Sequence, residues 1–333
     1  MLPPPLRGPE AALLKILCFA NIINSMNKKI ITFTMSLKQS QFEVDRLETE
    51  AKKIGIEVNR ALYRDLTFDL KNPSPAEAGA PLDRGARVFV KGEEVTKENT
   101  MGMWFRVAGT VSGKYTEGRN LAIRLLQKDI FCANHEGYLN WTRMGKIAQH
   151  GLFLEKEIPV VDTNVFYTKE QVLSHEWKYP VIAKHEKGYQ GKSVRKFDNE
   201  KELKKFVKRI DEINVGMFLW QKYLPTRWDI RVIVLDGKAI GGMKRSAVGE
   251  EFRSNFSLGG EVEPWQLSTE DKALAEKVAN VCGLDYCGVD IMKDENDKSY
   301  ILEVNRQCQF QGFEKSTGIN VAKLVVEMFL RKS

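Results

Sequence analysis

Two acidic residues near the C-terminus carry the clearest chemical signal. Asp290 and Glu303 each lie within an otherwise apolar, strand-like run. If these runs form a hairpin with a two-residue turn at Asn296-Asp297, the two carboxylates lie opposite each other, with Cβ atoms about 4.5 to 5.5 Å apart. Asn305 points the same way as Glu303 because side chains alternate along a strand. Facing carboxylates call for a cation, and Mg²⁺ prefers carboxylate and amide oxygens. The pattern predicts a magnesium site; a merely solvated hairpin face is the alternative.

A segment with lysines and glycines could bind phosphate. Lys184 ends an apolar run, and Gly188, Gly191 and Lys192 follow it. Glycines let backbone amides approach phosphate oxygens, and lysines neutralise the phosphate charge. The segment is not a Walker P-loop, because Glu186 stands where that motif needs its first glycine. A flexible loop over the phosphates fits better, and an ordinary hairpin turn is the alternative.

Four cationic side chains follow in the next part of the chain: Arg231, Lys244, Arg245 and Arg253. Asp236-Gly237 between two β-rich runs predicts a two-residue hairpin turn. Its register places Arg231 opposite Gly242, and it places Asp229 opposite Lys244. Such clusters bind phosphates and stabilise charge on a transferring phosphoryl group. A basic surface patch is the alternative.

Other chemistries have little support in the sequence. The four histidines lack metal-binding H-x-x-x-H spacing, and no G-x-S-x-G elbow is present. The five cysteines include no C-x-x-C pair, which argues against a zinc site and a disulfide framework and indicates a reducing cytoplasm. Three aromatic residues around one strand end could stack on an adenine, although core packing is the commoner fate: Trp220, Tyr223 and Trp228.

The elements that position these residues form a mixed pattern. A strand at Ile30 to Phe33 and an amphipathic helix closed by Gly55 begin a small α/β domain. Ser268 with Asp271 predicts the start of a later helix. Strands alternate with helices while the hairpins require antiparallel pairing, so the class is α/β of layered type.

Composition indicates an ordered protein of two or three lobes. The chain has 333 residues, 43% hydrophobic and 29% charged, with a net charge of +7. This charge suits an anionic partner without choosing among nucleotide, nucleic acid, acidic peptide and membrane surface. Residues 1–27 contain an apolar run that Lys15 interrupts and that is too short to span a bilayer. We expect a disordered tail or an upstream extension before a start at Met26; a signal-peptide leader, which Arg7 and the run from Ala11 to Ile23 loosely resemble, is the alternative.

Together these motifs resemble the ATP-grasp superfamily, and within it the RimK-like carboxylate-amine ligases, which include glutamate ligases. The resemblance runs almost continuously from Asn140 to the C-terminus. It implies an ATP-grasp domain over residues 140–333, with a central lobe at about 140–222 and a C-terminal lobe at about 223–333. Residues 28–139 resemble a pre-ATP-grasp α/β domain in outline.

The resemblance also implies roles for individual residues. The phosphate-binding residues would be Lys146, Lys184 and, in the loop from Glu186 to Ser193, Gly188, Gly191 and Lys192. The WQKYL segment is similar to the hinge that receives adenine, mostly through backbone atoms, and contains Gln221, Lys222, Tyr223 and Leu224. This family often has glutamate where Lys222 stands. The DIR and FRSN segments would supply Asp229 beside the ribose and, as catalytic residues, Arg231, Arg253 and Asn255. VDI and LEVN would supply the magnesium ligands Asp290, Glu303 and Asn305, in agreement with the hairpin argument.

One segment departs from the family pattern. After Asn305 the family usually continues with small residues and Pro-Gly, whereas this chain reads Arg306-Gln307-Cys308-Gln309-Phe310. In the family that loop lies near the acceptor, so the substrate of this protein can differ from the best-known substrate of the family. A covalent role for Cys308 is a minor alternative.

The implied reaction uses ATP and magnesium to activate a carboxylate as an acyl phosphate, which an amine then attacks. Two magnesium ions are expected, and manganese could replace magnesium. The substrates would be an amino acid such as glutamate and a peptide, protein tail or small molecule. An ATP-grasp-like kinase and a non-catalytic ATP-binding regulatory module are the alternatives. Net charge alone suggests a nucleic-acid binder. We expect no membrane partner and no specific nucleic acid, and oligomeric state stays open because family members often assemble.

Overall fold

The computed structural model describes residues 28–36, 38, 40–71, 86–106, 113–141, 144–186, 193–248 and 261–333. Contacts divide the chain into two compact units. The first unit contains the chain up to Thr142 together with Gln309–Gln311 and Asn320–Ser333. The second unit contains Arg143–Cys308 and Gly312–Ile319.

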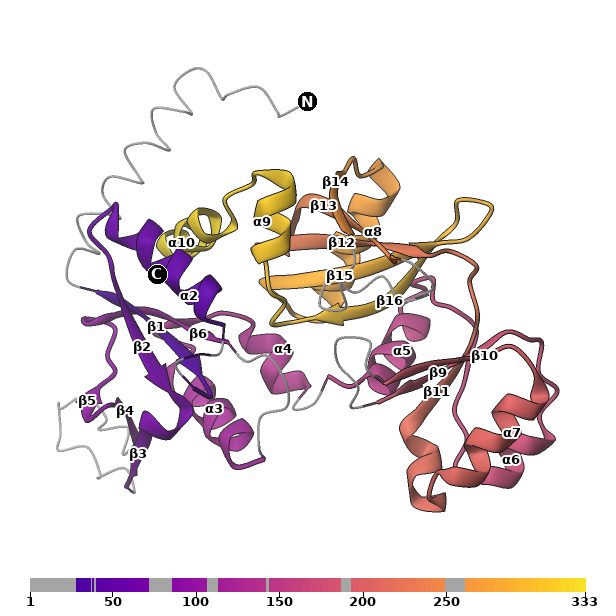
Figure 1. Cartoon of the computed structure of the whole chain (residues 1–333). Coiled ribbons are helices and arrows are strands. Elements are labelled where there is room, and N and C mark those ends of the chain that lie inside the picture. Colours follow the sequence, from indigo (N-terminus) through magenta and orange to yellow (C-terminus); the bar gives the residue numbers. More distant parts are fainter. Residues whose placement is uncertain are drawn as a thin grey trace. The chain divides into compact units, whose positions relative to one another are not determined.

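The first unit has a four-stranded parallel sheet of order β2-β1-β6-β7 and a three-stranded antiparallel sheet of order β3-β4-β5 (Figure 1). Its strands are β1 (Lys29–Thr34), β2 (Glu57–Leu62), β3 (Leu66–Leu70), β4 (Ala86–Val90), β5 (Glu93–Glu94), β6 (Thr100–Phe105) and β7 (Phe131–Cys132). Its helices are α2 (Gln41–Lys52), the 3-10 turn η1 (Tyr63–Asp65), α3 (Gly113–Leu126), α4 (His135–Asn140) and α10 (Val321–Lys332).

Helices cover both faces of the parallel sheet. Figure 1 shows α2 and α10 together on one side and α3 on the other. Val44, Leu47 and Ala51 form the buried stripe of α2, and Gly55 ends its turn with a φ of 76° that disfavours a side chain. Aromatic rings of Phe33, Tyr63, Phe105 and Tyr138 contribute to the core between the sheet and α3.

The last helix differs from the expected domain division. Residues 320–333 were expected in the second domain, whereas their contacts belong to the first unit. The reason is the apolar face of α10, which packs on α2 and β6. The Phe329 ring lies 5.3 Å from the Phe131 ring, and a Cβ on Gly102 would come 2.5 Å from Phe329 Cδ1. The expected split of the second domain into lobes at about residue 222 stays a prediction.

The second unit has two antiparallel sheets, of order β10-β9-β11-β8 and β14-β13-β12-β15-β16. Its strands are β8 (Thr163–Asn164), β9 (Val181–His185), β10 (Val194–Phe197), β11 (Phe218–Lys222), β12 (Trp228–Leu235), β13 (Lys238–Ser246), β14 (Glu261–Trp265), β15 (Tyr286–Lys293) and β16 (Ser299–Asn305). Its helices are α5 (Lys146–Glu155), α6 (Lys169–Ser174), α7 (Glu200–Arg209), η2 (Glu212–Met217), α8 (Thr269–Val281) and most of α9 (Gln311–Thr317).

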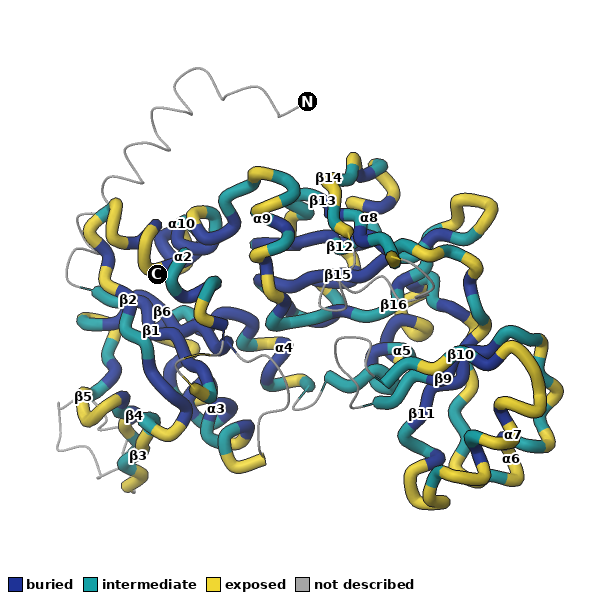
Figure 2. Tube along the Cα trace, in the orientation of Figure 1, coloured by how far each residue is buried: buried dark blue, intermediate teal, exposed yellow. Residues whose placement is uncertain are grey.

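Alternation along the strands leaves one face of the five-stranded sheet for polar groups. Helix α8 packs against β12, β13, β15 and β16, and it begins at Ser268, whose hydroxyl accepts from the Asp271 amide at 3.0 Å as expected. Ile230, Val232 and Val289 are completely buried. The residues between them on β12 and β15 point to the opposite face. Figure 2 shows the central strands β12 and β15 as predominantly buried, whereas the residues of β13, β14 and β16 are mostly intermediate or exposed.

The β12–β13 hairpin has the expected turn but a different register. Asp236 and Gly237 have positive φ of 51° and 72°, as the predicted turn requires. A bulge with Ile240 as the extra residue then shifts the pairing by one. Arg231 therefore pairs with Met243 rather than Gly242, and Asp229 pairs with Arg245 rather than Lys244.

In the β15–β16 hairpin, Asp290 and Glu303 lie opposite each other as expected, but the turn is not the expected two-residue turn. The connection spans Asp294 to Lys298, and the Asp294 carboxylate accepts from the Asn296 and Lys298 amides at 2.9 and 3.0 Å. This turn shifts the register by one relative to the expected two-residue turn. A bulge at Leu302 shifts it back, so Asp290 lies opposite Glu303.

The remaining expectations concern membranes, cysteines and one tryptophan. In the described ranges, no helix is both long and apolar enough to cross a bilayer. Cys132, Cys282, Cys287 and Cys308 are buried free thiols. Trp220 is completely buried in the aromatic core beside the β10-β9-β11-β8 sheet, so core packing describes it rather than stacking on a nucleotide.

Candidate active site

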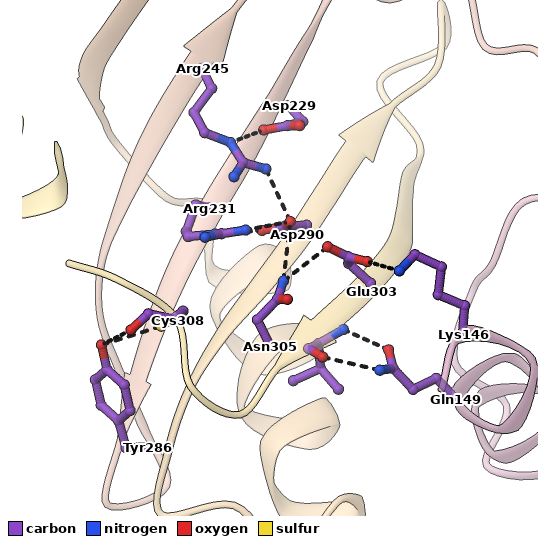
Figure 3. Close-up of polar contacts among 11 residues, drawn as sticks. Lys146, Gln149, Asp229, Arg231, Arg245, Tyr286, Asp290, Glu303, Asn305 and Cys308 are labelled. Atoms are coloured by element: carbon purple, nitrogen blue, oxygen red, sulfur yellow. Dashed lines mark hydrogen bonds and ion pairs between the residues drawn. The ribbon is translucent and has the colours of Figure 1, made fainter. Parts of the chain in front are cut away.

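Asp290 is the centre of the polar face of the five-stranded sheet (Figure 3). Its carboxylate accepts from Arg231 Nε and Nη2, both at 2.7 Å, in a bidentate pair. Arg245 Nη2 lies 3.0 Å from the same carboxylate. Because Asp290 is only 4% exposed, these arginines replace the solvent that would otherwise stabilise its charge.

Arg245 connects Asp290 to a second carboxylate. Its Nε donates to Asp229 Oδ1 at 2.5 Å, and both side chains are buried. The bulge in the β12–β13 hairpin creates this pair by bringing Arg245 opposite Asp229. Arg245 stood in the basic group expected from the sequence, but its position between two carboxylates was missed, because the register depends on the bulge.

Glu303 and Asn305 continue the polar face on β16. Asn305 Nδ2 donates to Glu303 Oε1 at 3.1 Å and lies 3.5 Å from Asp290 Oδ2. Lys146, at the start of α5, lies 3.3 Å from Glu303 Oε2. The three expected metal ligands therefore lie together, and the expected phosphate-binding Lys146 lies beside them.

These pairs change the acidity of both carboxyl groups. Burial raises the pKa of Asp290, but the charges of Arg231 and Arg245 outweigh it, and the pKa is lowered. Burial likewise opposes the Glu303 charge, and Lys146 is the main group that lowers its pKa. For Arg231, burial disfavours the charge while Asp290 favours it, and the pKa is raised. The lowered pKa values of Asp290 and Glu303 and the raised pKa of Arg231 mean that these three groups are ionised at neutral pH.

Helix α5 is fixed to β16 by a residue that the sequence reasoning missed. Gln149 Oε1 accepts from the Val304 amide at 2.8 Å, and its Nε2 donates to the Val304 carbonyl at 3.1 Å. Lys146 lies one helical turn before Gln149 on the same face. The sequence did carry a signal for this contact, because Gln149 is a polar residue at a position of α5 where the helical spacing predicts a buried side chain.

The start of α5 is also held by the segment that follows Lys184. Glu186 Oε2 accepts from the Ile147 amide at 2.9 Å. A Cβ on Gly145 would lie 1.7 Å from Glu186 Oε1, so a larger residue at this position would require the Glu186 carboxylate to move away from the start of α5. The acidic side chain satisfies an amide that has no partner within the helix.

Lys184, on β9, carries a charge with no direct counter-ion. Burial lowers its pKa, with Glu303 opposing the shift and Lys146 adding to it. In the part of the chain that the structure describes, its ammonium makes no hydrogen bond and no ion pair. An anion such as a phosphate would supply the missing charge, which fits the expected role of Lys184.

The expected adenine hinge lies at the end of β11. The Lys222 amide donates to the Asp162 carbonyl at 3.0 Å, and the Tyr223 amide donates to the Pro180 carbonyl at 3.4 Å. Gln221 Nε2 donates to Thr163 Oγ1 at 2.7 Å. Among the described residues nothing donates to the buried Gln221 Oε1, and an exocyclic amine would satisfy it. Leu224 is buried at 7% exposure.

Five expected residues lie outside the described part of the chain: Gly188, Gly191, Lys192, Arg253 and Asn255. Their roles stay predictions. Within the described residues, three carboxylates and four cations share the site, a balance that suits an additional anion: Asp229, Asp290 and Glu303 against Arg231, Arg245, Lys146 and Lys184.

The donor set fits a hard cation. Asp290, Glu303 and Asn305 offer only oxygen ligands, which Mg²⁺ prefers. The Asn305 amide nitrogen now faces the carboxylates, so binding through Oδ1 requires rotation of the amide. In the described ranges, no group of three or more His, Cys, Asp or Glu side chains is placed to hold a metal ion.

Comparisons with known proteins agree with this fold. The RimK-like ATP-grasp domain matches residues 144–329. A probable alpha-L-glutamate ligase 2 of Pseudoalteromonas atlantica is 33% identical over 156 residues, covering 46% of this chain and 51% of that protein. Beta-citrylglutamate synthase B of Danio rerio is 33% identical over 155 residues, covering 46% and 38%. The chain thus spans about half the length or less of these two curated relatives.

A solved structure shows the same fold over almost the whole chain. The ATP-grasp ligase PsnB complexed with a minimal precursor matches with a TM-score of 0.68 and 20% identity, covering 92% of this chain and 100% of that one. The fold is the α/β ATP-grasp fold. The chain belongs to the RimK-like ATP-grasp family.

Proposed function

We propose that this protein is an ATP- and magnesium-dependent carboxylate-amine ligase that forms an amide through an acyl phosphate. The observation that carries the proposal is the polar face around Asp290, where metal-type oxygen ligands lie among phosphate-type cations. Neither set alone would indicate this reaction. Together they fit phosphoryl transfer to a carboxylate.

In the first step, an oxygen of the substrate carboxylate attacks the γ-phosphorus of ATP. The new O–P bond forms as the bond to the β-phosphate oxygen breaks, and ADP leaves. Lys146 and Lys184 bind the phosphates, and Arg231 stabilises the charge that develops on the transferring group. The protein supplies position and charge, so the step needs no nucleophilic side chain.

In the second step, the amine nitrogen attacks the carbonyl carbon of the acyl phosphate. The C–O bond to phosphate breaks, inorganic phosphate leaves, and the amine proton passes to solvent. Arg253 and Asn255 are the residues proposed to face the acyl phosphate. The proposed mechanism gives no covalent role to Cys308, which is buried and donates its thiol to the Tyr286 hydroxyl at 3.2 Å.

Asp290, Glu303 and Asn305 would hold magnesium, which supplies charge neutralisation on the phosphates when bound. We propose two ions, with manganese as a substitute. Gln221 and the backbone from Lys222 to Leu224 would receive the adenine, with Asp229 beside the ribose.

For substrates, we propose an amino acid such as glutamate as the amine and a peptide or small carboxylate as the acceptor. The names of the relatives, a glutamate ligase and a citrylglutamate synthase, support glutamate. PsnB was solved with a precursor peptide, which supports a peptide. The Arg306–Phe310 segment would distinguish this acceptor from those of relatives. The buried free thiols support a reducing compartment, the cytoplasm.

The test is release of ADP and phosphate from magnesium ATP across a panel of carboxylates and amines. The wild-type chain is compared with an Asp290→Asn, Glu303→Gln double variant. A Glu295→Gln variant is the matched control, because this exposed carboxyl lies in the turn of the same hairpin.

A ligase requires both substrates for turnover, yields an amide detectable by mass, and loses activity only in the double variant. A phosphorylated product that forms without an amine would instead identify a kinase. Tight ATP binding with no hydrolysis under any pairing would indicate a regulatory module. Equal turnover by the double variant and the wild type would contradict the proposed site.

A further inference from the structure

Helix α7 of the second unit concentrates its cations on one exposed face. Its apolar side chains Leu203 and Val207 are completely buried in the core beside the β10-β9-β11-β8 sheet. Helical spacing places the cations of the helix on the opposite side, where all of them are exposed (Figure 2): Lys201, Lys204, Lys205, Lys208 and Arg209. No apolar residue of α7 lies on this face.

The two carboxylates of α7 do not balance these cations. Glu200 pairs with Lys204 at 2.8 Å. Glu202 is engaged at the start of the helix, where its carboxylate accepts from the Asp198 amide at 3.1 Å and from Asn199 Nδ2 at 3.0 Å. Within the part of the chain that the structure describes, no carboxylate lies within ion-pair distance of the other four cations: Lys201, Lys205, Lys208 and Arg209.

This arrangement of charge opposes the stability of the helix. Lys201, Lys205 and Arg209 follow one another at four-residue intervals, and Lys204 and Lys208 are also four residues apart. Like charges at this spacing face each other on a helix and repel. The helix dipole favours Lys208 and Arg209 in the last turn, but it disfavours Lys201 in the first turn. Folding alone therefore does not account for this face, whereas an anionic partner would.

The composition of the face indicates the kind of partner. Insertion into a membrane surface needs an exposed apolar side, and the apolar side of α7 is buried in the core. Protein interfaces are depleted in lysine and centre on aromatic or apolar anchors, which this face lacks. A nucleic-acid backbone needs only closely spaced cations. The rise from Lys201 to Lys208 is about 10 Å, or about three phosphate steps of one strand of a duplex.

We propose that the outer face of α7 binds the phosphate backbone of a nucleic-acid duplex, with Lys201, Lys205 and Lys208 as its cationic contacts. Contacts to phosphate position a duplex without reading its bases, so the binding is independent of sequence. The surface uses none of the residues assigned to the ligase reaction. It needs no ATP, so it can fail or succeed independently of the ligase proposal.

The first test uses the full-length wild-type chain without ATP. Fluorescence anisotropy measures its binding to labelled DNA duplexes of about 20 base pairs, at salt concentrations from about 50 to about 200 mM. We expect saturable binding, equal affinity for two unrelated sequences, and a logarithm of the binding constant that falls linearly with the logarithm of the salt concentration. No binding at the lowest salt concentration would overturn the proposal. Tighter binding of a labelled polyglutamate of equal net charge would assign the face to acidic peptides instead.

The second test removes the three lysines together in a Lys201→Gln, Lys205→Gln, Lys208→Gln variant. Glutamine is a good helix former and removes the repulsion, so we expect the variant to fold. At about 100 mM salt its affinity for the duplex should weaken about tenfold or more, and the salt slope should fall by about two to three, because each phosphate contact contributes about 0.9. Lys201→Gln alone should lower the slope by about one, and it decides if the triple variant does not fold.

The matched control replaces three exposed lysines elsewhere in the second unit by glutamine: Lys238, Lys272 and Lys298. It makes the same change in net charge and should bind the duplex as wild type does. Equal weakening in the control would show that net charge alone attracts the duplex, and the α7 site would be overturned. An unchanged affinity and salt slope in the α7 variants would place the duplex elsewhere on the protein and would also overturn the site.

Discussion

Asp290 shows how one buried carboxylate can serve both stability and function. Two guanidinium groups hold it ionised, and the same guanidinium groups are suited to phosphate. Removing one side chain of such a buried group leaves a charge without a partner, which is costly. If an anion and a cation bind together, the arginines can pair with the anion and the carboxylate with the cation, so no buried charge is left unpaired. The site is therefore ready for a nucleotide phosphate and its counter-ion in the same event.

The lowered pKa values of Asp290 and Glu303 predict how stability depends on pH. A carboxyl group with a lower pKa in the folded state contributes stability above its unfolded pKa, about 4, and loses it as pH falls through the folded value. Wild type should therefore lose more unfolding free energy than Asp290→Asn does as pH falls from about 5 to about 2, because the difference develops below the unfolded pKa of about 4. Urea unfolding at several pH values measures this difference.

The control for that experiment is Glu295→Gln, which removes an exposed carboxyl from the same hairpin and should follow the wild-type pH profile. A parallel loss of stability in wild type and Asp290→Asn would mean that the buried pairs contribute nothing to acid sensitivity.

At the scale of elements, the sequence predicted the strands and the site face but not the exact pairing. The Asp236-Gly237 turn was correct, yet Ile240 enters as an extra residue and moves Arg245 opposite Asp229. At the β15–β16 hairpin, the prediction that Asp290 lies opposite Glu303 is confirmed, but the predicted two-residue turn is wrong. The longer turn and the bulge at Leu302 shift the register in opposite directions, and the two shifts cancel. Bulges depend on packing across the sheet, and local residue preferences do not reveal them.

Helix α5 offers a prediction about local propensity. Gly151 is an exposed interior position of α5, and a Cβ there would have nothing within 4 Å. Gly151→Ala should therefore stabilise the protein by about 1 kcal/mol, because glycine is the poorer helix former. Gly55→Ala is the matched contrast: its Cβ would also meet open space, but its φ of 76° makes alanine strained. Chemical denaturation should give changes of opposite sign, and destabilisation by both variants would contradict this account.

At the scale of the whole molecule, the two units do not follow one another simply along the chain. The first unit is completed only by the last helix, after the chain has formed the second unit. This return could not be predicted from the sequence, because an amphipathic C-terminal helix can pack on any apolar surface of suitable shape. The partner was determined by Gly102, whose missing side chain leaves room for Phe329 against β6.

Phe329→Ala should therefore destabilise the first unit selectively. The Phe329 ring is completely buried among first-unit residues, and truncating such a ring costs about 3–5 kcal/mol. Hydrogen exchange should speed up in β1, β6 and α2 while β12 and β15 keep their protection. Glu327→Ala is the control, since this partly exposed side chain of α10 pairs with Lys323 at 3.8 Å, and such surface pairs contribute about 1 kcal/mol or less. Equal loss of protection in β15 would show that α10 supports both units, and the division of the chain drawn from its contacts would then not describe its cooperative units.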